Sequence, residues 1–394
     1  MINIEKNKSL YIVFMALLGG IAPVSTDMYL AAIPQIADGW GVGKNLVNLT
    51  LVLWFVSYSF CILVAGSLSD KYGRKPILLG GLAFFVVASI LCAMSSDVYQ
   101  LIVFRIMQGA GAGAPSAIVM AIIRDKFQGS ERHRVLAYIM TIVAVAPMVA
   151  PMVGAMMLKY FSWRYIFFVQ AFIVVLALLI AFSFKETIAE KLNTRIIKLV
   201  TRYGVHVKNR RFMMANFSLG LLALPLYGFI AFSPLYYISI NNLSEQTFSI
   251  FFGANAFCAM LGSFTSSKIA KKVSDDKIVL YSLLGCLTGG AGVLLFAGVH
   301  YIIFFCSMAI FTFFLAMNRP LSGSIIIGLV DTDIGSASSL MVSSQFLCGA
   351  LCMALVTHQW ESPSLVFGTV IFMTSALVLS VWLRIAKSVI SSAS

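Results

Sequence analysis

The sequence predicts an all-α membrane protein with twelve transmembrane helices in two bundles of six. Apolar residues make up 60% of the 394 residues and charged residues only 11%, about half the charged fraction of a soluble domain. Long apolar stretches separated by short charged segments recur along the whole chain. Each stretch is close to the roughly 20 residues that a helix needs to cross a bilayer.

The spans are expected in two sets of six, on either side of the longest polar segment. In chain order they lie near 10–34, 46–66, 77–95, 98–120, 135–158, 163–184, 212–238, 246–267, 278–298, 302–327, 336–358 and 364–386. The segment 185–211 carries eight Lys or Arg residues. It predicts a cytoplasmic connector between domains 1–184 and 212–394, two bundles that rock about a central site. A single bundle without moving halves is the alternative, and IIKLV at 196–200 favours an interfacial amphipathic helix within the connector.

The distribution of basic residues predicts the orientation of the chain. Of 28 Lys and Arg residues, 23 fall on the side of the amino terminus, and only Lys44, Lys159 and Arg164 fall on the opposite side. Basic residues of short loops stay in the cytoplasm, so both termini are expected there and the charge does not indicate a nucleic-acid-binding surface. Lys6 and Lys8 before an apolar run resemble a signal peptide, but the lack of a small-x-small cleavage site predicts a retained first helix.

No motif predicts catalysis or metal binding. All seven cysteines lie in predicted spans without metal-ligand spacing and behave as small apolar residues. None of the four histidines has a partner motif, and no nucleophile elbow or phosphate-binding loop occurs. The sequence therefore predicts a protein that is not an enzyme and has no metal or cofactor.

Seven motifs carry a resemblance to a known family. They are TDMYLAAIPQIA in the first span, LSDKYGRKP after the second, FRIMQGAGAGA in the fourth, AIIRDKFQG after it, APMVAPMVG in the fifth, WRYIFF opening the sixth and GSASSLMVSSQFLCGAL in the eleventh. The chain resembles the major facilitator superfamily, and more closely the bicyclomycin/chloramphenicol-resistance (Bcr/CflA) branch of drug:proton antiporters. The resemblance implies the major facilitator fold, with pseudo-two-fold symmetry. An internal echo agrees with it, because GSLSDKYGRKP follows the second span and GSFTSSKIAKKVSDDK the eighth.

The segment between the second and third spans matches a gating motif of this family. The residues assigned to gating are Gly66, Asp70, Gly73, Arg74, Lys75, Arg124 and Asp125. Gly73 can adopt a positive φ for a tight turn, and we expect Asp70, Arg74 and Lys75 to stay hydrated at the cytoplasmic surface. The resemblance implies that Asp70 faces the start of helix 11 and that Arg74 pairs with Asp125. An ordinary basic loop is the alternative.

The fifth span contains Pro147, Pro151 and Gly154 in the sequence APMVAPMVG. The prolines are expected to bend the helix, while Gly and Ala permit close helix packing. The resemblance implies that this antiporter signature seals the halves against proton leak. A kinked helix without this role is the alternative.

Asp27 is the only one of the fifteen acidic residues that lies well inside a predicted span. An ionised carboxylate at mid-membrane costs about 3 kcal/mol, so Asp27 should face water, meet a cation or take up a proton. At 1.5 Å per residue, Asp27 and Arg105 each lie about 10 Å from the outer ends of their spans, so their depths match. We expect proton and substrate to compete for a site that contains Asp27 and is tuned by Arg105. A static ion pair between them is the alternative.

Further residues are candidates for a substrate cavity. They are Tyr29, Met107, Gln108 and Met120 in the first half, and Asn318 and Arg319 in the second. Arg319 stands where the branch normally has a small apolar residue, and Ile62 and Ser67 also depart from the branch. If Arg319 faces the cavity, anionic substrates are favoured; the alternative is that it snorkels to the surface.

Together these features predict a proton-driven exporter of small amphiphilic molecules in a bacterial inner membrane, working as a monomer by alternating access. The first alternative is a dedicated exporter of an anionic metabolite or polycarboxylate siderophore. The alternative of another class is a non-transporting membrane receptor or scaffold. Small-molecule substrate, protons and lipid are the expected partners, with no nucleic acid.

Overall fold

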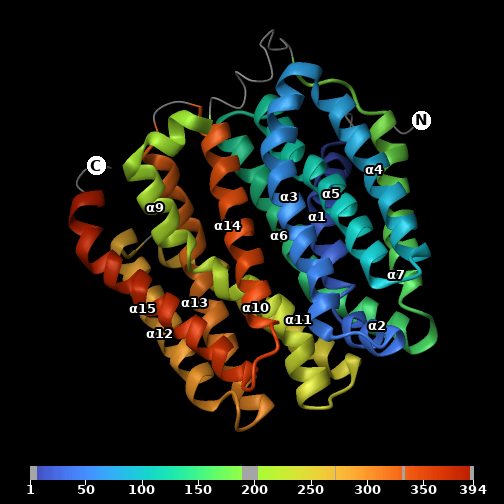
Figure 1. The fold of residues 1–394 in the computed structure, drawn as a ribbon. Helices are drawn as coiled ribbons and strands as arrows, with labels where there is room; N and C mark the ends of the chain where they lie inside the picture. The colour runs from blue at the N-terminus through green and yellow to red at the C-terminus, as the bar shows by residue number, and fades with distance from the viewer. Residues whose placement is uncertain (1–6, 189–202, 271, 331–332, 391–394) are drawn as a thin grey trace. The chain divides into compact units, whose positions relative to one another are not determined.

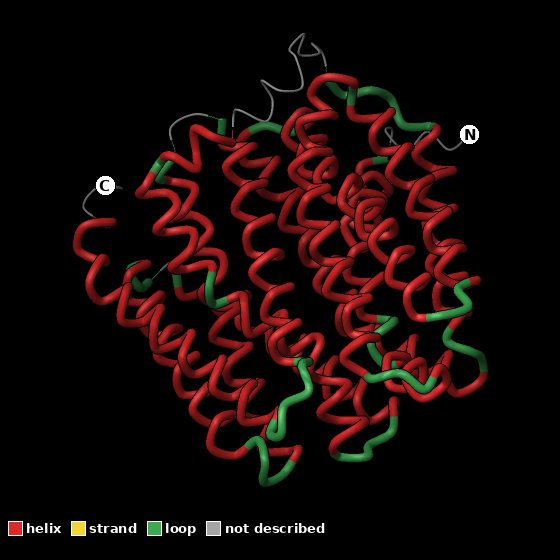
Figure 2. Tube along the Cα trace, viewed as in Figure 1, coloured by secondary structure: helices red, strands yellow, loops and turns green. Residues whose placement is uncertain are grey.

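The computed structural model describes residues 7–188, 203–270, 272–330 and 333–390, and the chain forms two compact units, Met1–Tyr203 and Gly204–Ser394 (Figure 1). Among these described residues, twelve helical segments are long and apolar enough to cross a membrane. The predicted all-α fold with twelve transmembrane helices is confirmed. Figure 2 shows helices joined by short loops, with no strand in the described part of the chain. The IIKLV segment lies outside the described residues.

Unit 1 contains the first six spans. Its helices are α1 Lys8–Asp27, α2 Ala32–Trp40, α3 Lys44–Tyr72, α4 Arg74–Met94, α5 Val98–Lys126, α6 Gly129–Tyr160 and α7 Arg164–Phe182. The residue just before the helix caps two of them: Asn7 accepts hydrogen bonds from the N–H groups of Ser9 and Leu10 at α1, and Asp97 does the same for Tyr99 and Gln100 at α5. Such caps satisfy backbone donors that have no partner within the helix.

Glycines on α5 bring α3 and α4 against it. A Cβ built at Gly109 would lie 2.4 Å from the carbonyl oxygen of Trp54 on α3, and one at Gly111 would lie 2.7 Å from the Cα of Phe85 on α4. A Cβ at Gly113 would lie 2.7 Å from that of Cys61 on α3. The three glycines therefore permit close approach of α3 and α4 to α5, and small residues at such contacts are typical of membrane helices.

The first predicted span, 10–34, is not one continuous helix. α1 ends at Asp27, residues 28–31 form a turn, and α2 begins at Ala32. The hydroxyl of Thr26 lies 3.3 and 3.2 Å from the carbonyl oxygens of Ala22 and Pro23 and donates its one hydrogen to Oδ1 of Asp27 at 2.8 Å. Such local side-chain bonds compete with the regular backbone ladder. The buried turn is packed by α6, because a Cβ at Gly154 would lie 2.1 Å from the carbonyl oxygen of Met28.

Unit 2 contains the remaining six spans, and its first span is also divided. The elements are α9 Arg210–Gly220, α10 Ala223–Pro234, the π-helix η2 Leu235–Ile240, α11 Glu245–Ile269, α12 Asp275–Phe296, α13 Tyr301–Gly328, α14 Ile334–Val356 and α15 Pro363–Ile390. The predicted single helix 212–238 is thus wrong in detail. Pro225 lies in the first turn of α10, where proline is best tolerated, and it has no N–H that could continue the backbone hydrogen bonds of α9.

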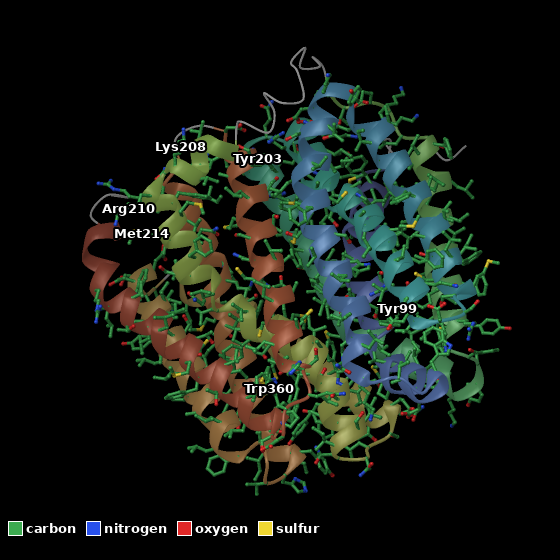
Figure 3. All side chains as sticks on the ribbon, viewed as in Figure 1. Tyr99, Tyr203, Lys208, Arg210, Met214 and Trp360 are labelled. Atoms are coloured by element: carbon green, nitrogen blue, oxygen red, sulfur yellow. The ribbon has the colours of Figure 1, made fainter. Side chains whose placement is uncertain are left out.

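Large apolar side chains are exposed on both units. Tyr99, Met214 and Trp360, which Figure 3 labels, are 67%, 47% and 40% exposed. Exposed apolar surface on this scale is unusual for a soluble monomer. It is the surface expected of helices that contact lipid.

Candidate functional site

Arg74 is held by three hydrogen bonds where α3 meets α4. Gly73, which joins these helices, has φ 108°, so the predicted positive φ is observed. Nε of Arg74 donates to Oδ2 of Asp125 at 2.9 Å, and Nη1 donates to Oδ1 of Asp70 and Oγ of Ser69, each at 2.6 Å. The pair that the resemblance implied between Arg74 and Asp125 is present, and it ties α4 to the end of α5.

The expectation that Arg74 stays hydrated is wrong. Its side chain is only 2% exposed, because three acceptors surround the guanidinium. Asp70 and Lys75 are partly exposed, and Nζ of Lys75 donates to the carbonyl oxygen of Phe182 at 2.8 Å. Buried charges are tolerated where they are paired and hydrogen-bonded, so this network holds unit 1 together at one membrane surface.

Glu186 completes this network, and sequence reasoning missed it. Its two carboxylate oxygens accept hydrogen bonds from the backbone N–H groups of Arg74 and Lys75 at 2.9 and 3.2 Å, which caps the start of α4. Partial burial acts to raise the pKa of Glu186, but these N–H donors and those of Thr187 and Ile188 lower that pKa below its usual value. The only signal in the sequence is an acid directly after the sixth span.

The other gating residues have smaller parts within unit 1. The carbonyl oxygen of Gly66 accepts a hydrogen bond from the hydroxyl of Ser69 at 2.8 Å. Nε of Arg124 is 3.9 Å from Oδ1 of Asp125, and Arg124 is 47% exposed. The implied contact of Asp70 with the start of helix 11 would join the two units, and it stays a prediction.

A buried polar cluster surrounds Arg105 inside unit 1. Arg105 on α5 is fully buried, and its Nη1 donates to Oε1 of Gln108 and to the carbonyl oxygen of Ser25 on α1. Nε2 of Gln108 donates to Oγ of Ser89 at 2.8 Å and to Oε1 of Gln170 at 3.0 Å. Four helices (α1, α4, α5 and α7) therefore meet at one hydrogen-bonded network, in which Nη1 of Arg105 is bonded and Nε and Nη2 have no acceptor among the described residues.

Aromatic rings cover the remaining faces of the guanidinium. Its central carbon lies 4.7 Å from the ring centroid of Tyr29, 5.6 Å from that of Trp54 and 5.8 Å from that of Phe167. The hydroxyl of Tyr29 is in turn 2.8 Å from that of Thr50. Ring faces attract cations, so the rings offset part of the cost of burying a charge that has no acidic partner among the described residues.

Arg105 and Asp27 do not form the ion pair that matching depths suggested. All ion pairs among the described residues join other groups, and the carboxylate of Asp27 instead accepts a hydrogen bond from Thr26 at 2.8 Å. The reason is angular. The side chain of Ser25 faces Arg105, and Asp27, two positions later, points roughly 200° away around the helix axis. Equal depth was not sufficient for contact.

Asp27 lies at the last residue of α1 and is 3% exposed, so it does not face lipid. The carboxyl end of a helix carries partial negative charge, which disfavours an ionised acid there. α6 runs from Gly129 to Tyr160 without interruption despite Pro147 and Pro151, and its Gly154 packs on the turn that follows Asp27. The proposed role of this signature in sealing the halves stays a prediction.

Gln170 and Ser89 belong to the Arg105 cluster but were not singled out in the sequence. Each is a lone polar residue within an apolar span, which was the available signal. Gln108 and Tyr29, which were predicted for a cavity, instead line this packed cluster and are fully buried. Met107 is partly exposed and Met120 is 47% exposed on α5, and their assignment to a cavity stays a prediction.

Unit 2 contains a pocket of about 150 Å³ that Arg319 lines. Its polar lining residues are Asn318, Arg319 and Ser322 from α13 and Gln345 from α14, and apolar side chains complete the wall. Arg319 therefore lies at a pocket, although it is exposed, and Nη2 lies 3.4 Å from Oε1 of Gln345. Asn318 is buried and accepts a hydrogen bond from the hydroxyl of Ser322 at 2.9 Å.

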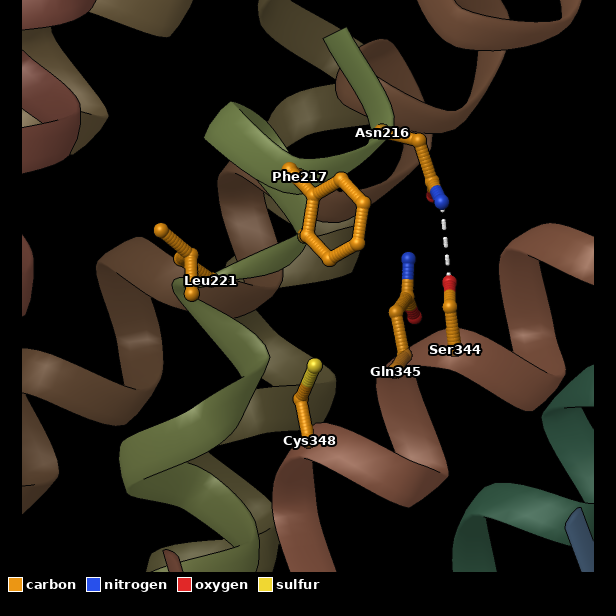
Figure 4. A pocket seen from close by; sticks show the side chains of 7 residues that line it. Asn216, Phe217, Leu221, Ser344, Gln345 and Cys348 are labelled. Carbon is orange, nitrogen blue, oxygen red and sulfur yellow. Dashed lines mark hydrogen bonds between the residues drawn. The ribbon is translucent and has the colours of Figure 1, made fainter. Parts of the chain in front are cut away.

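A smaller recess adjoins this pocket and shares Gln345 with it. Figure 4 shows Asn216 and Phe217 of α9 facing Ser344, Gln345 and Cys348 of α14. Nδ2 of Asn216 donates to Oγ of Ser344 at 2.9 Å. The break between α9 and α10 borders both hollows, because Leu221 lines the recess and Leu222 lines the pocket.

Within the described residues, no group of three His, Cys, Asp or Glu side chains is arranged to hold a metal ion. All seven cysteines are free thiols. The site chemistry of this chain is therefore that of charged and polar side chains buried among apolar helices.

Two six-span units, each with a break in its first span, are the architecture of a membrane transporter. The model of the Major Facilitator Superfamily matches residues 15–353, and the chain belongs to this family. It is a transporter and not an enzyme, and it is a multi-pass bacterial membrane protein.

Individual relatives are distant. The chain is 29% identical over 370 residues to the uncharacterized MFS-type transporter YdgK of Bacillus subtilis, covering 92% of each chain. It is 27% identical over 367 residues to a bicyclomycin resistance protein homolog of Haemophilus influenzae, covering 90% of each. The crystal structure of a mutant of the peptide transporter POT in complex with sulfate superposes with a TM-score of 0.76 at 15% identity, over 97% of this chain and 95% of that one. The last likeness shows the fold alone.

Proposed function

We propose that this protein exports small amphiphilic molecules across the bacterial inner membrane in exchange for protons. It does so as a monomer, with both termini in the cytoplasm, by alternating access of its two units, and the proton gradient drives it without a cofactor. The relative named for bicyclomycin resistance supports a place among drug exporters of this family.

The observation that carries the proposal is the position of Asp27. This carboxylate is 3% exposed at the end of α1, and no cation pairs with it among the described residues. An ionised acid inside a span costs about 3 kcal/mol. Protonation removes that charge, so closing the site favours the protonated form, and opening it to water permits release. The turn at 28–31 gives the helix a place to bend during this exchange.

Asp27→Asn separates coupling from substrate exchange. In inverted vesicles, we expect the variant to retain counterflow of a transported compound, which needs no net proton movement, but to lose uphill uptake driven by a pH gradient. Asp38→Asn is the matched control, because Asp38 is exposed on α2. The compounds should include cationic, neutral and polycarboxylate molecules. An Asp27→Asn variant that still pumps uphill on a pH gradient contradicts the coupling role.

A second candidate is a dedicated exporter of an anionic metabolite or polycarboxylate siderophore. The observation that favours it is Arg319, a cation at a pocket that no acidic residue lines in the described part of the chain. Under this alternative, Arg319→Ala lowers the uptake of polycarboxylates relative to cationic compounds. If Arg319→Ala does not change the preference between polycarboxylates and cationic compounds, this second candidate is rejected and the first proposal remains.

A further inference from the structure

We infer that the pocket on unit 2 is an oxyanion subsite, in which Arg319 binds a carboxylate of the transported molecule. The inference rests on the proposed function, because it names the chemical class of one part of the cargo.

Arg319 lies well inside its helix. α13 runs from Tyr301 to Gly328, so Arg319 is nine residues from its carboxyl end, about 14 Å at 1.5 Å per residue. A charged side chain at such a position is costly and is retained for a partner or a polar cavity. Arg319 borders such a polar pocket.

Arg319 has no counter-charge among the described residues. None of the ion pairs found among the described residues involves Arg319. Its one hydrogen bond within this part of the chain, to the amide oxygen of Gln345, is 3.4 Å long, close to the limit for such a bond. A guanidinium has five N–H donors in a planar fork. Most of its donor capacity is therefore open to an acceptor that enters the pocket.

The other polar groups that line the pocket are neutral. Gln345 carries an amide that can turn its N–H₂ toward an anion, and Ser322 has a hydroxyl near the buried amide of Asn318. One cation and neutral donors, with no acid among the described lining residues, favour negative charge. The apolar remainder of the wall, which includes Leu222, Leu315 and Ile326, suits a hydrocarbon or aromatic body beside the charged group.

A planar guanidinium selects planar oxyanions, because it can form two parallel hydrogen bonds with a carboxylate. Such a site distinguishes a carboxylate from the amide of the same shape. An anionic lipid headgroup offers oxyanion chemistry as well, so the test must separate lipid from cargo.

The test measures binding of 2-naphthoate and its neutral match, 2-naphthamide, to the purified full-length protein in nanodiscs of zwitterionic lipid. We expect naphthoate to bind about tenfold more tightly, and the preference to vanish in Arg319→Gln and to survive in part in Arg319→Lys. Arg384→Gln is the control, since Arg384 is an exposed arginine of α15 in the same unit. Equal binding of the two probes by the wild-type protein overturns the inference, whether or not any variant folds.

A second arm repeats the measurement in nanodiscs that contain phosphatidylglycerol. If phosphatidylglycerol leaves naphthoate binding unchanged, the result supports a cargo site. If it abolishes naphthoate binding to the wild-type protein but not to the Arg319→Gln variant, Arg319 binds the lipid headgroup and the inference is overturned. The experiment needs no transport. The two proposals can fail separately. If the wild-type protein prefers naphthoate but the Asp27→Asn variant still pumps uphill, proton coupling through Asp27 is rejected and the oxyanion subsite stands.

Discussion

Removing the guanidinium of Arg74 should destabilise unit 1 far more than removing that of its neighbour Arg124. Arg74 is 2% exposed and donates to Asp70, Asp125 and Ser69, whereas Arg124 is 47% exposed and only approaches Asp125 at 3.9 Å. The two arginines share an acidic partner and differ in burial. They therefore provide a matched comparison within one network.

The magnitude follows from the contacts. Hydrogen bonds to charged groups contribute about 1.5–3 kcal/mol each, and removing one partner of a buried ion pair costs about 3–5 kcal/mol. Asp70 and Asp125 are 25% and 16% exposed, so water compensates part of the loss. We expect Arg74→Gln to lower the free energy of unfolding by about 3 kcal/mol and Arg124→Gln by less than about 1 kcal/mol.

The assay is unfolding of the purified protein in mixed micelles by titration with an ionic detergent, followed by circular dichroism. A double-mutant cycle with Arg74→Gln and Asp125→Asn should give a coupling energy of about 1–2 kcal/mol. The reasoning is refuted if Arg74→Gln costs no more than Arg124→Gln. A coupling energy near zero would likewise show that the pair does not contribute to stability.

Two further predictions concern packing and pH. Gly111→Ala places a Cβ 2.7 Å from the backbone of Phe85 and should lower the free energy of unfolding by about 1–3 kcal/mol. The control Gly80→Ala has open space around the new Cβ and should be neutral or stabilising. Equal effects of the two variants in thermal unfolding would contradict the close packing of α4 on α5. Because the pKa of Glu186 is lowered in the folded state, its contribution to stability is present above its unfolded pKa and is lost as the pH falls through the folded value. Glu186→Gln should therefore reduce stability at pH 7, by at most about 1 kcal/mol since the side chain is exposed, and this effect should shrink as the pH falls below 4.5. Glu361→Gln is the control, because Glu361 lies in the exposed loop before α15. The cap is contradicted if the stability difference between Glu186→Gln and the wild-type protein does not change with pH, or if Glu361→Gln shows the same difference.

Much of the fold and of the gating network could be predicted from the sequence. Span number and position follow from apolar length, because the cost of exposing polar backbone to lipid leaves helices as the only choice. The turn at Gly73 and the pairing of Arg74 with Asp125 were also predictable, the first from glycine's freedom of φ and the second from the family resemblance.

The partners of Asp27 and Arg105 could not be predicted from depth alone. Depth is a one-dimensional coordinate, whereas contact also depends on the direction in which each side chain leaves its helix. The break after Asp27, the hydrogen bond from Thr26 and the rings around Arg105 set those directions. They depend on packing by other helices, which no local pattern encodes.

Because hydropathy is a local property, the amino-acid sequence alone predicts the twelve spans and the positions at which charged residues interrupt the apolar runs. Tertiary structure decided which of those charges are satisfied. Arg74 has its acids, Arg105 has amides and rings, and Arg319 has a pocket without a counter-ion among the described residues. Electrostatic partnership depends on distances of a few ångströms between helices that are remote in the chain, and only folding sets them.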